Sequence, residues 1–282
     1  MKEISILLKH KNREDNMNIH SVKLVYFSPT GTSKQVVEAI AKGIQASGEH
    51  LNLTPPASRN QEFEKLHDEL AVIAAPVYAG RIPPEAVYRL RRLSADNTPA
   101  VLVAVYGNRH YDDALIELHD LTIELGFKPI AGGAFIGEHT YSTAEVPTAH
   151  GRPDADDLEK AAEFGRKIKE KMRGISGPQD VPPLRVPGNH PYREGVRATG
   201  EPMDPVTRED LCIKCGKCAE VCPTSAITVS DVVTTQADAC IWCCACVKNC
   251  PTGARIMRPR MQQASKWLHT NYNERREPET YL

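Results

Sequence analysis

The segment that decides the fold contains all nine cysteines of this chain. It reads CIKCGKCAEVCP over residues 212–223 and CIWCCACVKNCP over residues 240–251. Each half contains the run C-x2-C-x2-C-x3-C followed by proline. The likeness extends beyond the runs, because Thr224 and Ala226 in the first half correspond to Thr252 and Ala254 in the second. The segment is therefore an internal repeat.

This cysteine spacing is the one that binds 4Fe–4S clusters. A cubane cluster needs four thiolates, and one tight loop supplies three of them. In two-cluster proteins the fourth cysteine of each run binds the other cluster. We therefore assign one cluster to Cys212, Cys215, Cys218 and Cys250, and the other to Cys222, Cys240, Cys243 and Cys246. Two zinc sites, disulfide bonds and a chance match are the alternatives, but zinc motifs do not usually require the third close cysteine and the trailing proline in both halves.

The ninth cysteine, Cys244, fits neither run. We expect a small residue packed within the cluster loop. Ligand exchange and a redox-active thiol are the alternatives.

Composition indicates an ordinary globular chain and excludes several classes of function. The 282 residues suggest two domains, and 41% hydrophobic with 25% charged residues is typical of globular proteins. The net charge of −1 favours neither nucleic acid nor a membrane surface, and no apolar run reaches the length of a spanning helix. The opening residues are too weakly apolar for a signal peptide. Cysteines confined to one segment favour a reducing, cytoplasmic location.

The first strand of the chain is expected at 22–27, where the residues are mostly apolar. A loop rich in hydroxyl groups follows, and then a helix whose apolar residues recur at helical period. Hydroxyl groups, a glycine and a helix N-terminus together suit a phosphate group. An ordinary helix N-cap is the alternative. The candidate phosphate-binding residues are Ser28, Thr30, Gly31, Thr32 and Ser33.

The chain continues with alternating strands and helices. Strands are expected at 50–54, 70–75, 100–105 and 130–136, and helices at 84–93, 112–125 and 154–172. This alternation predicts a doubly wound α/β fold with a parallel sheet. Ligands of such sheets lie at the carboxyl ends of the strands.

Two loops at those carboxyl ends combine aromatic rings, glycines and hydrogen-bonding groups, which suits a flat heterocycle. Tyr78 is the first candidate for stacking on it, ahead of Tyr106 and Tyr111, although each ring could instead belong to the rim or the core. His139, after the fifth strand, is a candidate to hydrogen-bond the heterocycle or is a surface-loop histidine. The candidate residues of the two loops are Pro76, Val77, Tyr78, Ala79 and Gly80, and Tyr106, Gly107, Asn108, Arg109 and Tyr111.

These motifs carry a family resemblance. Residues 22–172 resemble a flavodoxin, with SPTGT at 28–32 similar to its FMN phosphate loop and the loops at 76–81 and 106–109 similar to its two isoalloxazine loops. With the cysteine segment and the closing REPETYL at 276–282, nearly the whole chain is similar to the flavodoxin–ferredoxin fusion proteins of anaerobic prokaryotes. The resemblance implies a sheet of strand order 2-1-3-4-5, a small α+β ferredoxin-like domain, one FMN and two 4Fe–4S clusters.

The expected organisation has five parts. They are a disordered tail (1–16), an FMN-binding domain (17–173), a Pro/Gly-rich linker (174–205), a two-cluster ferredoxin domain (206–260) and a C-terminal tail (261–282). The linker is either a free tether or an ordered strap, and we favour the strap because electron transfer requires fixed spacing. Trp267 is expected to dock the tail.

The expected function is electron transfer between the two clusters and FMN, and on to redox partners in anaerobic metabolism. The partner is either a redox protein or a small-molecule acceptor, and in the second case the chain is an FMN-dependent reductase fed by the clusters. A regulatory module that has lost its flavin is a third reading, opposed by the intact hydroxyl loop. The sequence leaves the oligomeric state open.

Overall fold

The structure is a computed structural model that describes residues 21–67, 69–195 and 201–282. The tail expected at 1–16 lies outside the described residues. The same is true of residues 17–20 of the expected FMN-binding domain and of 196–200 in the expected linker.

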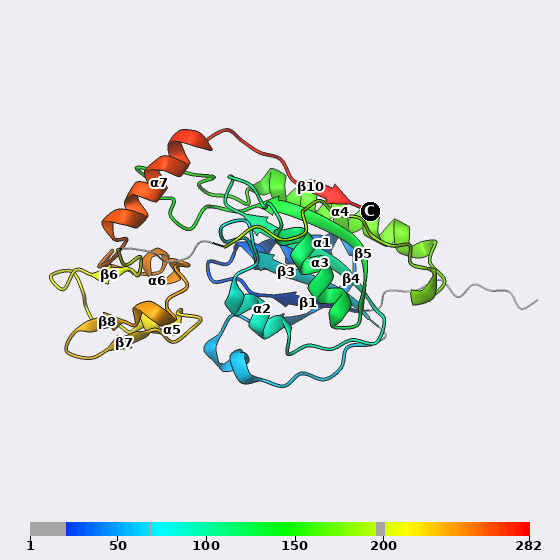
Figure 1. Ribbon diagram of the computed structural model, residues 1–282, viewed down its shortest axis with the longest axis horizontal. Helices are drawn as coiled ribbons and strands as arrows, with labels where there is room; N and C mark the ends of the chain where they lie inside the picture. Colours follow the sequence, from blue (N-terminus) through cyan, green and yellow to red (C-terminus); the bar gives the residue numbers. More distant parts are fainter. Residues whose placement is uncertain (1–20, 68, 196–200) are drawn as a thin grey trace, which may run out of the picture.

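A six-stranded sheet forms the larger part of the molecule, in the order β10-β5-β4-β3-β1-β2 (Figure 1). The first five strands along the chain are parallel, so the expected order 2-1-3-4-5 is confirmed. The buried strands β3 and β4 are almost wholly apolar, as a parallel sheet covered on both faces requires. The five strands are β1 (Ser21–Tyr26), β2 (Ser47–Asn52), β3 (Leu70–Pro76), β4 (Thr98–Tyr106) and β5 (Phe127–Ile136).

Several strands differ from expectation, and β4 and β5 begin at Thr98 and Phe127 rather than at the expected 100 and 130. The edge strand β2 begins at Ser47 and ends at Asn52, ahead of the expected 50–54, because its mostly exposed residues give no apolar signal. The sixth strand, β10 (Glu279–Tyr281), was not expected. It pairs antiparallel with β5 and so brings the end of the chain back to the sheet.

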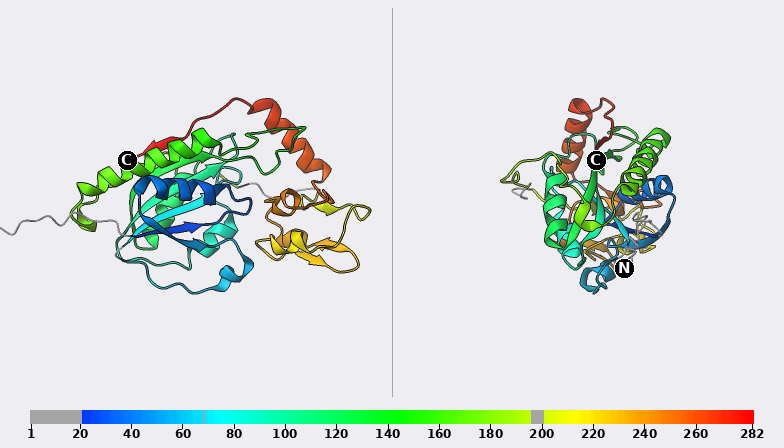
Figure 2. Two further views of the ribbon diagram at one scale, coloured as in Figure 1. Left: turned by 180° about the vertical axis from the view of Figure 1, so that it is seen from behind. Right: turned by 90° about the vertical axis from the view of Figure 1, so that its right-hand side faces the viewer.

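Four helices cover the sheet, two on each face (Figure 2). Helices α1 and α4 share one core, and α2 and α3 share the other. Glycines permit the close approach of α1 to α4, because a Cβ on Gly43 would lie 1.9 Å from the carbonyl oxygen of Ala162. The helices are α1 (Thr32–Ile44), α2 (Pro84–Leu90), α3 (Ala114–Glu124) and α4 (Ala155–Arg173).

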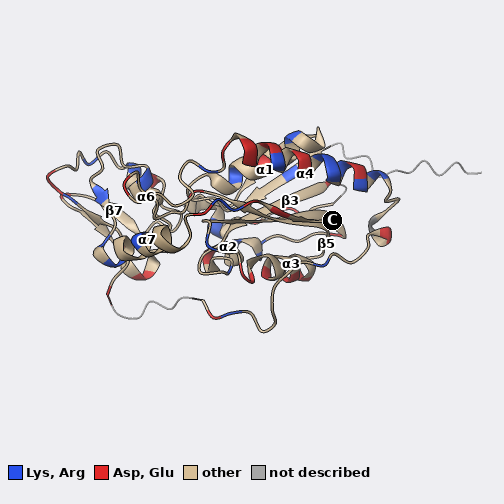
Figure 3. Cartoon of the chain, turned by 90° about the horizontal axis from the view of Figure 1, so that it is seen from above, with Lys and Arg blue, Asp and Glu red and all other residues tan. Residues whose placement is uncertain are grey.

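The cysteine segment forms a small domain beyond one end of the sheet (Figure 1 and Figure 3). Two antiparallel pairs frame it: β6 (Val206–Thr207) with β9 (Arg255–Ile256), and β7 (Ile227–Val229) with β8 (Val233–Thr235). Its helices are the single turns α5 (Lys217–Glu220) and α6 (Ala245–Lys248). Three 3-10 turns complete the described elements: η1 (Pro56–Asn60), η2 (Pro178–Asp180) and η3 (Ala237–Ala239).

The tail leaves the small domain as α7 (Pro259–Asn271) and ends in β10. Met261, Ser265 and Leu268 are the buried residues of α7, whereas Trp267 is 52% exposed. The expectation that Trp267 docks the tail is therefore wrong. The opposite face of the helix makes the contact instead, and Ser265 donates to the carbonyl of Tyr141 at 2.6 Å.

Part of the linker lies against the sheet domain. Leu184 is buried, and the carboxylate of Asp113 in front of α3 accepts from the backbone amides of Asn189 and Arg193 at 2.9 and 2.7 Å. Over these residues the chain is held to α3, as the strap interpretation expects.

Candidate functional site

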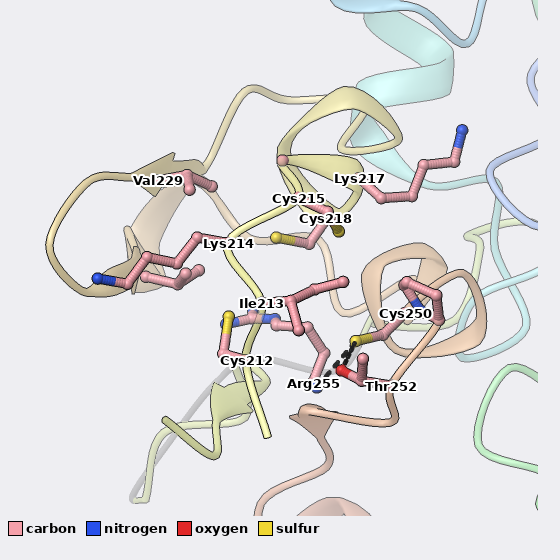
Figure 4. A pocket seen from close by; sticks show the side chains of 13 residues that line it. Cys212, Ile213, Lys214, Cys215, Lys217, Cys218, Val229, Cys250, Thr252 and Arg255 are labelled. Carbon is pink, nitrogen blue, oxygen red and sulfur yellow. Dashed lines mark hydrogen bonds between the residues drawn. The ribbon is translucent and has the colours of Figure 1, made fainter. Parts of the chain in front are cut away.

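The eight run cysteines line two separate hollows of the small domain. We call the first the outer hollow; Figure 4 shows its lining, which comes from the loop before α5 and the segment after α6. The second, the inner hollow, is closer to the sheet. The outer hollow is lined by Cys212, Cys215, Cys218 and Cys250, and the inner hollow by Cys222, Cys240, Cys243 and Cys246 together with the ninth cysteine, Cys244.

This grouping is the crosswise one that the spacing predicts, while binding of iron by these thiols stays a prediction. Among residues 21–67, 69–195 and 201–282, no group of three or more His, Cys, Asp or Glu side chains is arranged to hold one metal ion. The thiols of each set surround a space instead. Four thiols around a space fit the corners of a cubane cluster.

The repeat is also visible in the backbone of the two loops. Lys214 and Trp242 occupy equivalent positions and have φ of 53° and 58°, while Gly216 and Cys244 have φ of 77° and 54°. Cys244 therefore stands where the first loop uses a glycine. It is 1% exposed and packs with Met257 and Met261, in agreement with a packing role for the ninth cysteine.

Backbone amides point at the fourth cysteine of each run. The amide of Ala226 donates to Cys222 Sγ at 3.3 Å, and that of Arg255 donates to Cys250 Sγ at 3.4 Å. Hydrogen bonds to cluster sulfurs stabilise the reduced state and so tune the reduction potential. Burial raises the pKa of the Cys240 thiol to about 11, so a cationic partner such as iron is needed to hold it as a thiolate.

A buried arginine lies between the two hollows. Arg255 is 3% exposed, lines the outer hollow, and donates from Nη2 to Cys246 Sγ of the inner hollow at 3.7 Å. Its other partners are neutral oxygens of Thr207, Pro205 and Thr235. Within the described part of the chain no carboxylate pairs with it, and its Nε has no partner. Arg255 was not among the predicted site residues. The signal that could have found it is a departure from the repeat, because the first half has Ile227 at the equivalent position.

The hydroxyl-rich loop joins β1 to α1 at the carboxyl edge of the sheet. Gly31 precedes α1 with φ of 86°, and no side chain caps the first turn from that position. Ser28 has a structural role, since its hydroxyl accepts from the amide of Lys34 at 3.1 Å. The hydroxyl of Ser33 is fully buried and has no partner. An unpartnered hydroxyl at the start of a helix fits a phosphate group, with Thr30 and Thr32 half-buried beside it.

The loop after β3 makes a tight turn. Tyr78 and Arg81 exchange backbone hydrogen bonds of 2.9 and 3.1 Å, and Ala79 and Gly80 between them have φ of 54° and 81°. These angles suit a two-residue hairpin turn. Pro76 ends β3, and the amide of Val77 donates to Val105, which fixes the loop beside β4.

Tyr78 faces the small domain. Burial raises its pKa well above the usual value, and Cys243, Tyr141 and Cys244 raise it further. The ring predicted to stack on a heterocycle therefore lies next to the loop that lines the inner hollow. Its stacking role stays a prediction.

The loop after β4 does not present its tyrosines as expected. Tyr106 and Tyr111 are each 2% exposed, and the hydroxyl of Tyr111 contacts Glu279 at 2.7 Å and Tyr281 at 2.8 Å. His110 stacks on the ring of Tyr111 at 4.8 Å. Tyr106 and Tyr111 are therefore core residues, which was the alternative interpretation. Their predicted stacking on a ligand does not agree with this arrangement.

The remaining candidates of that loop also have protein partners. Asn108 donates to the carbonyls of Tyr272 and Glu274 at 2.6 and 2.8 Å, so it holds the tail. Arg109 pairs with Asp112. Gly107 lies against His139, because a Cβ there would stand 2.5 Å from the imidazole.

His139 is a neutral hydrogen-bond acceptor in this structure. Its Nδ1 accepts from the amide of Tyr141 at 3.0 Å. Burial, with smaller contributions from Lys248 and Arg109, lowers the pKa of His139 to about 4. The imidazole is therefore uncharged at neutral pH and accepts hydrogen bonds at Nδ1.

The carboxyl edge of the sheet meets the inner hollow. Ile241, which lines that hollow, packs against the core shared by α2 and α3. Lys248 of α6 binds Glu138 and donates to the carbonyl of Ser142 at 2.6 Å. The inner hollow is thus the one adjacent to the predicted flavin loops.

Comparison with known proteins supports the iron–sulfur segment. A family model described as a 4Fe-4S binding domain matches residues 205–228. Residues 205–228 therefore resemble a 4Fe–4S protein. No curated protein matches the chain.

Several solved structures are similar to the sheet domain. One is a flavodoxin from the domain Archaea (15% identity, 54% of this chain, 98% of that chain, TM-score 0.34). Others are the Fusobacterium nucleatum flavodoxin bound to flavin mononucleotide (12%, 54%, 98%, 0.35) and the metal-soaked Flv1 flavodiiron core from Synechocystis sp. PCC6803 (16%, 57%, 38%, 0.41).

Within the described residues no helix is both long and apolar enough to cross a membrane.

Proposed function

We propose that this chain is an electron-transfer protein of the flavodoxin–ferredoxin fusion type, with one FMN and two 4Fe–4S clusters. The observation that carries the proposal is the position of the inner hollow. Its four thiols lie beside the carboxyl edge of the sheet, where the hydroxyl-rich loop and Tyr78 are found. Bound there, FMN exchanges electrons in pairs or singly and each cluster exchanges one, so the chain joins the two kinds of transfer.

The chain's own residues bind, orient and insulate the cofactors. The hydroxyl of Ser33 and the first amides of α1 would hold the phosphate of FMN. The amides of Ala226 and Arg255 donate to the sulfurs of Cys222 and Cys250 and so would orient these two ligands. Ile241 packs on the sheet core and so holds the loop of the inner hollow against the sheet domain.

The two hollows suggest an order of transfer. The inner hollow adjoins the sheet edge, while Cys215 at the outer hollow is exposed. We infer that the outer hollow would hold the cluster nearer to a partner and the inner hollow the cluster nearer to FMN. The partner would be a redox protein that docks near Cys215.

Anaerobic purification tests the proposal. We expect about eight iron atoms per chain and one releasable FMN, with cluster signals in electron paramagnetic resonance after reduction by dithionite. A preparation with zinc in place of iron, or with neither iron nor flavin, would refute the proposal. Steady turnover of a quinone or nitro compound by the reduced protein would instead favour the FMN-dependent reductase.

A further inference from the structure

One arginine of the sheet domain is completely buried although it lies at the meeting point of the two domains. The side chain of Arg89, on α2, is 0% exposed. Its Nε donates to Glu85 one turn earlier at 2.9 Å, which supplies a counter-charge. A buried charge is costly unless it is paired and hydrogen-bonded, so the remaining donors need partners.

Most of those partners lie in the segment that follows β2. Nη1 of Arg89 lies 2.5, 2.8 and 2.8 Å from the carbonyl oxygens of Leu53, Thr54 and Pro55. It also lies 3.1 Å from the hydroxyl of Ser58. Residues 53–58 of the sheet domain therefore bend around the guanidinium.

The last donor crosses to the small domain. Nη2 of Arg89 donates to the carbonyl of Pro223, the residue directly after Cys222 of the inner hollow. An ion pair between the domains, Lys248 with Glu138, is partly exposed, with 26% and 21% of the two side chains accessible. Of these two contacts between the domains, the hydrogen bond from Arg89 to Pro223 is the buried one.

The same arginine is connected to the hydroxyl-rich loop. Thr54, whose carbonyl accepts from Arg89, also accepts at Oγ1 from the amide of Ser28 at 2.8 Å. The ring of Phe27, the residue before that loop, lies under the guanidinium at 5.3 Å. An unbroken series of contacts therefore runs from Ser28 through Thr54 and Arg89 to Pro223.

We propose that Arg89 is a positioning residue that ties the phosphate loop to the bend at Cys222 and Pro223, and so fixes the spacing between the flavin site and the inner hollow. What it positions rests on the proposed function, whereas the tie itself does not. The planar fork of arginine suits this task because it directs donors to two sides at once. The single ammonium of lysine cannot reach both segments together.

Hydrogen exchange measured by mass spectrometry on the full chain tests the tie. The variants are Arg89→Lys and Arg89→Gln. The matched control is Arg91→Gln, which removes an arginine two residues away whose side chain is 54% exposed and pairs with Glu124 at 2.9 Å. Both Arg89 variants should speed amide exchange at residues 28–34 and at 222–226 by about tenfold, because a charged hydrogen bond is lost on each side. The control should leave both segments unchanged.

Faster exchange near 53–58 alone, with residues 222–226 as in the control, would overturn the proposal. A merely structural arginine would also leave the reduction potential of the inner cluster unchanged in Arg89→Gln. We expect a lower potential in that variant, and a smaller change in Arg89→Lys, which retains the charge. If neither Arg89 variant folds, FMN added to flavin-depleted native chain should slow exchange at 222–226, and no slowing with FMN bound would overturn the tie. Absence of iron or flavin from the purified protein would refute the proposed function instead. Hydrogen exchange in the Arg89 variants would still test whether Arg89 joins the two segments.

Discussion

Replacing Arg255 by glutamine should lower the reduction potential of the inner cluster. The guanidinium is 3% exposed, lies 3.7 Å from Cys246 Sγ, and has no carboxylate partner within the described residues. A buried, unneutralised positive charge stabilises the electron that the cluster gains. Its removal should therefore make reduction harder.

The size of the effect follows from Coulomb's law. Two unit charges about 4 Å apart interact by about 4 kcal/mol at an effective dielectric constant of about 20. The added electron spreads over the whole cluster, which places much of it farther away, so about 2 kcal/mol is a reasonable share. For a one-electron couple about 1.4 kcal/mol corresponds to about 59 mV. We therefore expect a decrease of about 50–100 mV.

The assay is an anaerobic redox titration followed by electron paramagnetic resonance. Arg255→Lys retains the charge and should keep most of the potential. The control is Arg258→Gln, because Arg258 lies three residues on and its charge is already balanced by Asp204 at 3.2 Å. Equal shifts in Arg255→Gln and Arg258→Gln, or a potential in Arg255→Gln equal to that of the unmodified chain, would refute the reasoning.

Three further predictions follow from the cofactor loops. Cys222→Ala and Cys250→Ala should each remove about four iron atoms in a colorimetric iron assay, whereas Cys244→Ala should retain the full count; an unchanged count in Cys250→Ala would contradict its assignment as a cluster ligand. Gly31→Val should weaken FMN binding about tenfold in a fluorescence titration, because φ of 86° strains a side-chain-bearing residue by about 1–2 kcal/mol although space is available; equal affinity would exclude this loop as the phosphate site. The pKa of His139 is about 4 in the folded chain and about 6.5 in the unfolded chain. The folded state therefore binds fewer protons, and the free energy of unfolding should fall as pH decreases from about 6.5 toward 4. His139→Gln should flatten this dependence in urea unfolding, and an unaltered slope would show that another group is responsible.

The parallel sheet could be predicted because its strands are read from local pattern. β3 and β4 are continuous apolar runs that both faces of the sheet bury, and the α1 helix shows its apolar face at regular spacing. The three residues of β10 have no such pattern. They become a strand only through pairing with β5, a contact between distant parts of the chain that local sequence does not encode.

The candidate site could be predicted where the spacing of residues along the chain determines their positions. It could not be predicted where a side chain has several possible hydrogen-bond partners from distant parts of the chain. The cysteine runs determined which thiols share a hollow. Tyr111 is the kind of side chain expected at the rim of a ligand site. Its hydroxyl is instead hydrogen-bonded to Glu279 and Tyr281 of the returning tail, and the ring is buried. Arg89 carried no motif at all, since its importance lies in carbonyl groups from two domains that only the folded chain brings together.

The return of the tail to the sheet has a mechanical consequence. The small domain is preceded by a linker held at Asp113 of the sheet domain, and it is followed by α7 and β10, which end on β5. A body joined to another at one point can swing in any direction about that point. Joined at two separated points, it can turn only about the line between them, and the contact of Arg89 with Pro223 restrains that remaining rotation of the cysteine hollows relative to the sheet edge.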